Sequence, residues 1–375
     1  MTGQGGKYRV VISGYYGFGN AGDEAMLAAM LEALSGMEPE ISYTVISGSP
    51  EDTVRRHGVA AIHRLNFPAI VSAVSRCDLL ISGGGSLLQD VTSDRSVYYY
   101  LGIILLAKKL GKPVMLYGQG IGPLRRPMAR KAARLIVNQA DMITVRDEGS
   151  RRELASLEVT RPPILVTADP VLAINPVGRE IGRLVLRRAG VEGASPLIGF
   201  SVRECPDWEP CQAELAAAAE KLAAEFGARL VFLPMQWPDD VAAAAKVIAR
   251  LRCPVTAIEE NYGIPELMSI VGNLDLLVGI RLHALIFAAV MRVPLVGISY
   301  DPKIDGFLAS LGEVGAGTID TVKAEDILAR ARAVWAFRHA GAPGTAHRLA
   351  DLRRKALQNA ELAMEILETS RQARQ

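Results

Sequence analysis

Two basic side chains and an imidazole follow two neighbouring apolar runs in the C-terminal third of the chain. Arg281 and His283 come directly after the run 275–279, and Lys303 comes shortly after the run 294–298. Arginine and lysine bind phosphate and carboxylate groups, and an imidazole takes up and releases protons near neutral pH. These residues therefore predict a site that binds an anion and moves a proton.

The two apolar runs must belong to one β-α-β unit if these side chains are to meet. Each run has the length of a buried parallel strand, and residues 281–291 between them carry apolar residues at helical spacing. Open α/β proteins bind ligands at the carboxyl edge of the sheet, where helix N-termini also favour anions. We therefore expect Arg281, His283 and Lys303 to share that edge.

Polar and glycine-rich loops also follow the apolar runs of the N-terminal half, and they define its candidate ligand-binding residues. These residues are Asn20, Asp23, Gly83, Gly84, Gly85, Ser86, Gln119 and Arg146. Glycines leave room for a ligand, so a side chain at residue 84 is expected to block binding and leave the fold largely intact. The alternatives are structural: tight turns for the glycines and pairing with neighbouring acids for Arg146. For Asn20, Asp23 and Glu24 the alternative is helix capping, which is the preferred interpretation of Glu24.

One glycine pattern resembles a dinucleotide-binding fingerprint in form only. Gly17, Gly19 and Gly22 have the G-x-G-x-x-G spacing. The next predicted strand, residues 41–47, carries no acid at its end to bind a ribose. The sequence therefore disfavours dinucleotide binding.

The alternation of strands and helices occurs twice, which predicts an α/β fold of two doubly wound Rossmann-like domains facing each other across a cleft. The second set begins with the predicted strand 197–202, which ends in Arg203. The predicted domains are residues 1–175 and 176–340. Residues 341–375 are expected to form a C-terminal helix that packs back on the body of the protein.

Composition excludes several classes of protein. Half of the 375 residues are hydrophobic, and the formal net charge of +2 argues against a nucleic-acid-binding protein. The four cysteines have no C-x-x-C spacing, which argues against a zinc site or a disulfide framework. The chain has no signal-peptide pattern and no apolar run long enough to cross a membrane. We expect a cytoplasmic enzyme-like protein that uses no metal and no cofactor.

A basic group surrounds the start of one predicted helix. It comprises Arg125, Arg126, Arg130, Lys131 and Arg134. Such a group is usually solvated surface. The alternative is contact with anionic lipid headgroups, worth roughly 1 kcal/mol per cation, which would make the protein peripheral at the inner face of the membrane.

Several segments together resemble the polysaccharide pyruvyl transferase family. They are GYYGFGNAGDEA at 14–25, DLLISGGGSLLQD at 78–90, GQGIGP at 118–123, TVRDEGS at 144–150, GIRLHALIFAA at 279–289 and GISYDPK at 297–303. Within the family, the chain is similar to the bacterial S-layer cell-wall-polymer pyruvyltransferases (CsaB). The resemblance covers most of the chain, from the first strand to about residue 310.

The resemblance implies a fold like that of the GT-B glycosyltransferases and the transfer of a pyruvyl ketal from phosphoenolpyruvate, with release of phosphate. It implies a lipid-linked acceptor, an N-acetylmannosamine residue of a cell-wall polysaccharide precursor. It also matches Arg146, His283 and Lys303 to the family's functional arginine, histidine and lysine.

The residue types suit this chemistry. Ketal formation needs a proton for the methylene carbon, cations around phosphate and carboxylate, and a base for the sugar hydroxyls. His283 suits acid/base work, Arg146 can bind an anion through two parallel hydrogen bonds, and Lys303 supplies a point charge. Arg203 and Arg281 are further candidates for binding the same anion.

Two other functions remain open at this stage. One is a GT-B nucleotide-sugar glycosyltransferase, which would bind a nucleotide sugar in place of phosphoenolpyruvate. The other is a sugar- or nucleotide-binding module without catalysis, which would release no phosphate. For His283 itself, the alternative is a hydrogen-bonded structural histidine.

Overall fold

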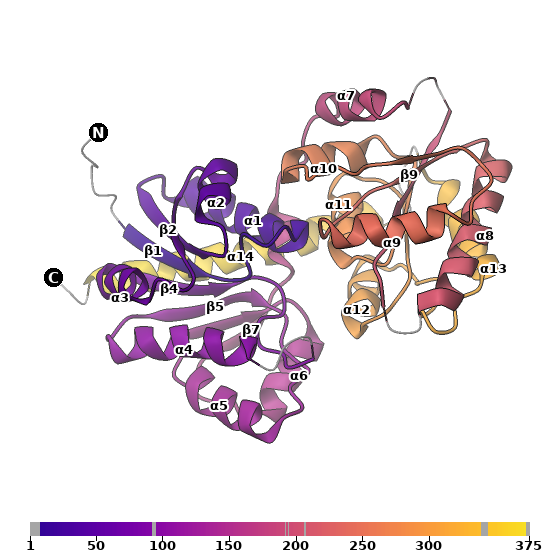
Figure 1. Ribbon diagram of the computed structural model, residues 1–375. Helices are drawn as coiled ribbons and strands as arrows, with labels where there is room; N and C mark the ends of the chain where they lie inside the picture. The colour runs from indigo at the N-terminus through magenta and orange to yellow at the C-terminus, as the bar shows by residue number, and fades with distance from the viewer. Residues whose placement is uncertain are drawn as a thin grey trace. The chain divides into compact units, whose positions relative to one another are not determined.

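Parallel strands alternate with helices in two separate units of the chain (Figure 1). The computed structural model describes residues 8–91, 95–191, 193, 195–205, 208–338 and 344–372. Of these, the first unit comprises 8–18, 23–174 and 352–372, and the second comprises 19–22 and 175–351 without the gaps. The expected α/β class with two parallel sheets is confirmed.

The first unit contains a seven-stranded sheet in the order β3-β2-β1-β4-β5-β6-β7, and every pairing is parallel. Its strands are β1 Tyr8–Ser13, β2 Ile41–Ser47, β3 Ala60–His63, β4 Leu79–Gly83, β5 Val114–Gln119, β6 Met142–Val145 and β7 Ile164–Val166. Its helices are α1 Ala21–Met37, α2 Pro50–His57, α3 Phe67–Arg76, α4 Ser96–Lys109, α5 Pro127–Val137, α6 Glu148–Ser156 and η1 Pro170–Ala173.

The chain order of this sheet reverses between β1 and β4, because β1 pairs with both β2 and β4. The loops that follow these two strands therefore lie next to each other at a topological switch point. Ligands of open α/β sheets bind at such points. The loop after β4 carries the predicted residues Gly84, Gly85 and Ser86.

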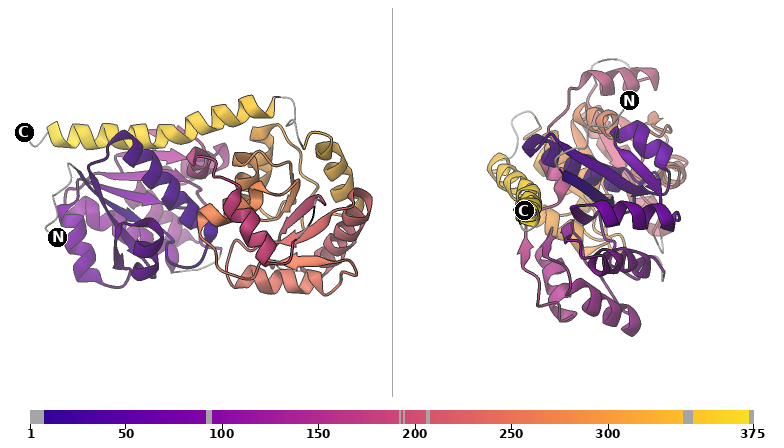
Figure 2. Two further views of the ribbon diagram at one scale, coloured as in Figure 1. Left: turned by 90° about the horizontal axis from the view of Figure 1, so that it is seen from above. Right: turned by 90° about the vertical axis from the view of Figure 1, so that its left-hand side faces the viewer.

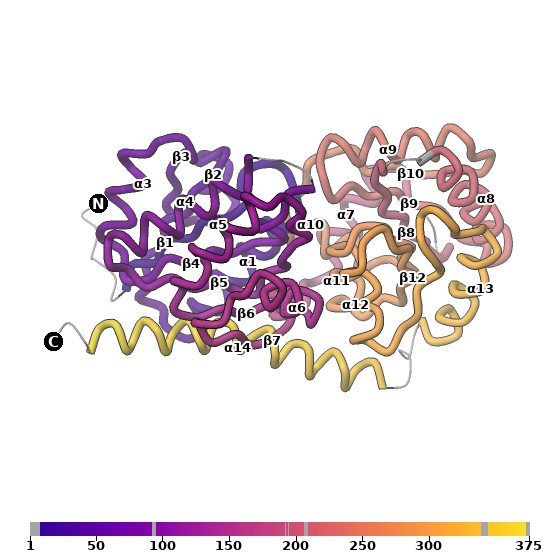
Figure 3. The backbone as a smooth tube through the Cα atoms, turned by 90° about the horizontal axis from the view of Figure 1, so that it is seen from below, coloured from indigo at the N-terminus to yellow at the C-terminus, as the bar shows by residue number. Residues whose placement is uncertain are grey.

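Helices cover both faces of the first sheet (Figure 3). α3, α4 and α5 contribute buried residues to the core on one face, and α1 packs on the other. The last helix, α14 Thr345–Gln372, adds Ala360, Ala363 and Leu367 to the α1 face (Figure 2). It is anchored by the Thr167 hydroxyl, which donates to the buried Asn359 Oδ1 at 2.8 Å. Residues 341–343 and 373–375 of the predicted tail helix lie outside the described residues.

The second unit contains a five-stranded parallel sheet in the order β10-β9-β8-β11-β12. Its strands are β8 Leu197–Ser201, β9 Arg229–Phe232, β10 Val255–Ala257, β11 Leu276–Gly279 and β12 Leu295–Gly297. Its helices are α7 Glu180–Arg188, α8 Trp208–Phe226, α9 Asp239–Ile248, α10 Ile264–Gly272, α11 Leu282–Val290, α12 Pro302–Leu311 and α13 Ala324–Trp335.

β11, α11 and β12 form the β-α-β unit that the sequence predicted. Eight of the nine α11 residues are buried, which explains why its hydrophobic pattern runs almost continuously around the helix. The order reverses between β8 and β11, which pair directly. The exits of β8, β11 and β12 carry Arg203, Arg281 and Lys303, so these cations share the carboxyl edge of one sheet.

Candidate functional site

In the first unit, the glycine loop after β4 is held by a carboxylate from the first turn of α1. The Gly85 N–H donates to Asp23 Oδ1 at 3.1 Å, and the Asp23 side chain is buried. Gly84 has φ +123°, a conformation that residues with a Cβ rarely adopt. Asp23 thus orders the loop on which the predicted ligand-binding glycines lie.

Arg146 leaves the end of β6 as a buried side chain held by acids from two loops. Its Nη1 donates to Asp169 Oδ2 at 3.1 Å, and its Nη2 donates to Ser86 Oγ at 3.3 Å. Asp147 Oδ2 lies 3.6 Å from Nε. Two carboxylates therefore balance much of the guanidinium charge, while Ser86 connects the residue to the glycine loop.

Gly120 makes this arrangement possible. A Cβ at residue 120 would lie 2.6 Å from Arg146 Nη2 and 2.8 Å from Ser86 Oγ. The backbone after β5 can approach the guanidinium this closely only because residue 120 has no side chain.

Two buried polar groups at this edge have no hydrogen-bond partner among the described residues. They are the Tyr16 hydroxyl and Gln119 Oε1. The amide of Gln119 donates only to Ser82 Oγ, at 3.1 Å. Burial, followed by the charges of Asp23 and Glu24, raises the pKa of Tyr16 well above its ordinary value, so the phenol stays neutral. Unpaired buried groups of this kind are available to a bound ligand or an ordered water.

Glu24 has a structural role in the neighbouring loop. One carboxylate oxygen accepts the Gly17 N–H at 2.7 Å, and the other lies 2.8 Å from His57 Nε2. Both side chains of this pair are 6% exposed. Glu24 therefore fixes the loop after β1.

We expect Gly84→Ala to lower the free energy of unfolding by about 1–3 kcal/mol, because φ +123° is strained for any residue with a Cβ. Crowding is not the cause, since the nearest atom to an added Cβ, the Tyr16 hydroxyl oxygen, would lie 3.6 Å away. This strain would add a cost in stability to the block of binding expected from a side chain at residue 84.

Chemical denaturation measures the effect, with Gly36→Ala as the matched control. Gly36 lies in α1, and an added Cβ there meets no atom within 4 Å. Alanine should be neutral or stabilising at this position. Equal stability of the two variants would contradict the strain argument.

In the second unit, Arg203 and Lys303 surround the ring of Tyr300. Arg203 Cζ lies 4.3 Å from the ring centroid, and Lys303 Nζ lies 5.0 Å from it. Lys303 Nζ is also 3.3 Å from Asp301 Oδ2. These residues come from the exits of β8 and β12, so the sheet brings together two of the predicted cations around a tyrosine that the sequence did not single out.

The cations change the acidity of Tyr300. Burial is the largest influence and raises its pKa, but Lys303, then Arg203 and more weakly Arg281 lower it, and the net pKa lies below the ordinary 10. Positive charge thus dominates this edge of the sheet and would stabilise a bound anion in the same way as it stabilises the phenolate.

Arg281 is bound by an acid. Its Nε donates to Asp240 Oδ2 at 2.9 Å, and its Nη2 pairs with Asp240 Oδ1. The Asp240 side chain is 1% exposed and also accepts the N–H groups of Met235 and Gln236. This carboxylate positions Arg281 and the loop after β9, so Arg281 contributes less free positive charge than Arg203.

His283 lies in the first turn of α11 against the backbone of Gly22, which belongs to the second unit. A Cβ at residue 22 would lie 2.0 Å from His283 Nδ1. Asn20 Oδ1 accepts the Gly22 N–H at 2.9 Å, and Asn20 forms a bridge with Gln236. Asn20 and Gly22 therefore shape the surroundings of the imidazole.

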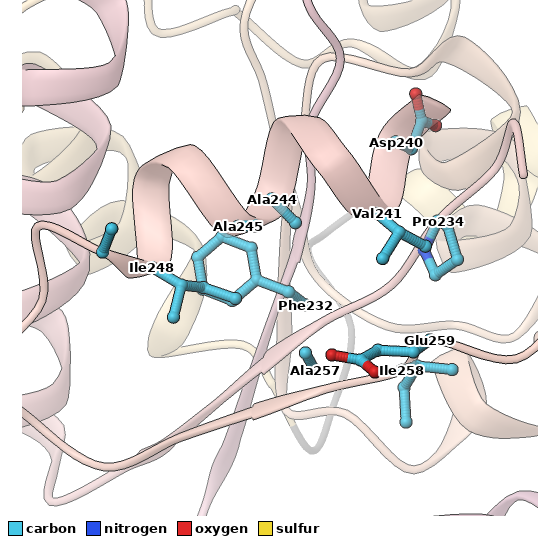
Figure 4. A pocket seen from close by; sticks show the side chains of 11 residues that line it. Phe232, Pro234, Asp240, Val241, Ala244, Ala245, Ile248, Ala257, Ile258 and Glu259 are labelled. Atoms are coloured by element: carbon cyan, nitrogen blue, oxygen red, sulfur yellow. The ribbon is translucent and has the colours of Figure 1, made fainter. Parts of the chain in front are cut away.

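An apolar pocket of about 280 Å³ lies beside the Arg281–Asp240 pair (Figure 4). Phe232, Ala245 and Ile248 line one part of it, and Ile258 lines another. Asp240 is at its rim, so the pocket and the cationic edge share one carboxylate. Its lining suits an apolar group better than a charged one.

We expect Lys303→Ala to raise the pKa of Tyr300, because the ammonium stabilises the phenolate. This pKa is measured by following tyrosine absorbance as a function of pH. The variant Tyr300→Phe shows which part of the absorbance change belongs to Tyr300. Lys323→Ala is the control, since Lys323 is exposed and pairs with Glu214. An unchanged pKa of Tyr300 in Lys303→Ala would show that the Lys303 ammonium does not stabilise the phenolate.

The basic group at α5 is partly neutralised within its own unit. Arg130 pairs with Glu153 and donates to the Leu124 carbonyl, and Arg134 pairs with Glu158. The Arg125 and Lys131 side chains are exposed. Met128 and Leu135 are also exposed on this helix, at 69% and 59%.

The described ranges contain neither a metal-binding cluster nor a membrane-spanning helix. No group of three or more His, Cys, Asp or Glu side chains within them is placed to hold a metal ion. No helix within them is long and apolar enough to cross a membrane.

The structure adds several residues that sequence reasoning missed. They are Tyr16, Gly120, Asp169, Asp240 and Tyr300. Tyr16, Gly120 and Tyr300 lie inside the segments that carry the family resemblance, which was the available signal. Asp169 and Asp240 had no such signal, because only tertiary structure brings them to their arginines.

Comparison with known proteins gives one family. The family model described as polysaccharide pyruvyl transferase matches residues 20–302. The amylovoran biosynthesis protein AmsJ of Erwinia amylovora is 21% identical over 361 residues, covering 81% of this chain and 86% of AmsJ.

Solved structures of low sequence identity show the fold. The UDP-GlcNAc 2-epimerase of Methanocaldococcus jannaschii superimposes with a TM-score of 0.65 at 11% identity, covering 95% of this chain and 99% of that one. The ADP-heptose LPS heptosyltransferase II of E. coli gives 0.54 at 13% identity, covering 89% and 100%. The two Rossmann-like units are thus of the GT-B type, as the sequence predicted.

Proposed function

The chain belongs to the polysaccharide pyruvyl transferase family, and from this premise we propose that it transfers a pyruvyl group from phosphoenolpyruvate to a saccharide. Two hydroxyls of one sugar become bonded to the central carbon of the donor as a ketal. The observation that carries the proposal is the family match over residues 20–302. The cationic edge around Tyr300 supports it, because the donor bears a phosphate and a carboxylate.

The proposed reaction balances without a cofactor or a metal. The methylene carbon of phosphoenolpyruvate gains a proton and becomes a methyl group. One sugar oxygen bonds to the adjacent carbon, and the second oxygen bonds there as the C–O bond to phosphate breaks. The two hydroxyl protons supply the new methyl C–H bond and the released phosphate.

Each predicted residue has a proposed part in this reaction. His283 transfers a proton, since an imidazole titrates near neutral pH. Lys303 and Arg203 bind the anionic donor at the edge of the second sheet, and Arg146 binds an anion at the edge of the first. Asp169 and Asp240 act as positioning residues for Arg146 and Arg281.

The proposed acceptor is a lipid-linked cell-wall polysaccharide precursor with an N-acetylmannosamine residue. A lipid-linked substrate would place the protein at the inner face of the membrane. The exposed Arg125 and Lys131 beside Met128 and Leu135 support surface contact through α5, because cations attract anionic headgroups and apolar side chains enter the interface.

Mass spectrometry of a saccharide acceptor after incubation with phosphoenolpyruvate tests the function. The expected product gains the mass of a pyruvyl ketal and one acidic group, and phosphate is released in equal amount. Calorimetric titration compares phosphoenolpyruvate with a nucleotide sugar. Binding of the nucleotide sugar alone, with a glycosidic product, would replace the proposal with a glycosyltransferase. Binding without phosphate release would indicate a module without catalysis.

A further inference from the structure

Arg64 occupies a fixed position at the carboxyl edge of the first sheet, one residue beyond β3. Its N–H donates to the carbonyl of Ser47, the last residue of β2, at 2.8 Å. Its own carbonyl accepts from the Tyr99 hydroxyl at 2.9 Å. The end of β2 and the start of α4 therefore determine where this side chain begins.

The guanidinium of Arg64 is held by aromatic rings and by no acid. Its Cζ lies 5.3 Å from the centroid of Phe18 and 4.9 Å from that of Tyr99. Within the described part of the chain, no carboxylate pairs with it, and its buried Nε has no hydrogen-bond partner. Arg146 and Arg281, by contrast, are both bound by carboxylates. The positive charge of Arg64 is therefore not balanced by a carboxylate among the described residues and would attract an external anion.

Large apolar side chains are exposed on the residues that follow Arg64 in the chain. Leu65 is 61% exposed and Phe67 is 56% exposed. Val71 lies one turn after Phe67 on the same face of α3 and is 42% exposed. Apolar residues exposed together next to a polar anchor are typical of an interaction surface.

Arg64 and Asp23 act on the same aromatic ring of the first unit. The pKa of Tyr100 is raised by burial and then by Asp23, while Arg64 lowers it. Asp23 is the residue that holds Gly85 in the candidate ligand-binding loop.

We propose that Arg64, Leu65, Phe67 and Val71 form a subsite for a phosphate group carried on an apolar hydrocarbon chain. The Arg64 guanidinium binds the phosphate, and the three apolar side chains bind the part of the chain next to it. The inference rests on the proposed function, because it assigns the lipid-linked end of the acceptor to this surface.

The combination of groups favours this occupant over simpler ones. A free anion such as phosphoenolpyruvate would make no use of the exposed apolar residues. A purely apolar chain would make no use of an unpaired guanidinium. Nucleic acid would require cations at several successive phosphates. A phosphate joined to an apolar chain uses all of these side chains.

Calorimetric titration of the full chain with farnesyl diphosphate tests the subsite, in the absence of phosphoenolpyruvate. Inorganic pyrophosphate and farnesol are the two partial ligands. We expect farnesyl diphosphate to bind more tightly than either. Arg64→Gln should weaken its binding by about tenfold or more, the loss typical of a charge-assisted hydrogen bond, and Arg64→Lys should weaken it less.

A second variant tests the apolar side chains of the proposed subsite. The double substitution Leu65→Ser and Phe67→Ser should remove the preference for farnesyl diphosphate over pyrophosphate and leave pyrophosphate binding unchanged. Arg76→Gln is the matched control, because Arg76 is an exposed arginine at the other end of α3. Thermal denaturation of each variant verifies that it is folded.

Equal farnesyl diphosphate affinity in folded Arg64→Gln and wild type would overturn the proposal. Cosedimentation with vesicles of phosphatidylcholine and phosphatidylglycerol gives the other contradicting result. If the vesicles bind through Arg64 while farnesyl diphosphate does not, the surface contacts the bilayer and is no acceptor subsite. Because these titrations involve no turnover, failure of pyruvyl transfer with retained farnesyl diphosphate binding would reject the proposed function and leave the subsite standing.

Discussion

His283→Ala is expected to reduce the rate of pyruvyl transfer by about 10²- to 10⁴-fold while phosphoenolpyruvate still binds. A proton transferred in the transition state affects the barrier more than it affects ground-state binding. The imidazole is held in the first turn of α11, where the backbone of Gly22 lies against it. Initial rates of phosphate release give the turnover, and calorimetric titration gives the donor affinity.

His347→Ala is the control for this variant. His347 is 84% exposed and pairs only with Asp351 on its own helix, so its removal should leave turnover unchanged. Gly22→Ala is a complementary variant. Its Cβ would lie 2.0 Å from His283 Nδ1, so it should displace the imidazole and lower turnover as well. Near-normal turnover in His283→Ala would make this residue a structural histidine.

Arg146→Ala is expected to lower the free energy of unfolding by about 3–5 kcal/mol, because it leaves a buried carboxylate without its partner. Asp169 is that carboxylate, and its side chain is 6% exposed. The same variant should lose about 10- to 150-fold in affinity for phosphoenolpyruvate, the equivalent of one charge-assisted hydrogen bond. Arg146→Lys should recover only part of this affinity, since an ammonium lacks the planar arrangement of donors.

A second substitution separates the two effects of Arg146. Adding Asp169→Asn to Arg146→Ala removes the unpaired charge, so stability should recover in part while donor affinity stays low. Arg151→Ala is the control, because the Arg151–Glu148 pair is exposed and worth no more than about 1 kcal/mol. If donor affinity recovers together with stability in the double variant, Arg146 has a purely structural role.

The central strands could be predicted closely from the sequence, and the edge strands could not. β2 begins and ends at the predicted residues 41–47, because a long buried run bounded by polar loops identifies a central parallel strand. β3 and β7 gave no such signal. They are short edge strands whose residues are partly exposed, so their composition resembles that of loops.

The placement of cations at strand exits followed from the sequence. Which of these cations are paired with acids did not. Strand alternation was enough to place Arg203 and Lys303 at one sheet edge, because all strands of a parallel sheet point the same way. Nothing in the local sequence indicated that Tyr300 lies between them. Arg203, which is distant in the chain, is brought to Tyr300 and Lys303 only by the order of strands in the sheet.

The sequence by itself determined the fold class, the family and the types of side chain at each strand exit. Only the tertiary structure decided that Arg146 and Arg281 are bound by Asp169 and Asp240, while Arg64 has no carboxylate partner among the described residues. The spacing of hydrophobic residues along the sequence indicates which residues are buried. Whether a cation is neutralised depends on acids that lie 23 and 41 positions away in the chain, and their approach depends on strand order and loop conformation.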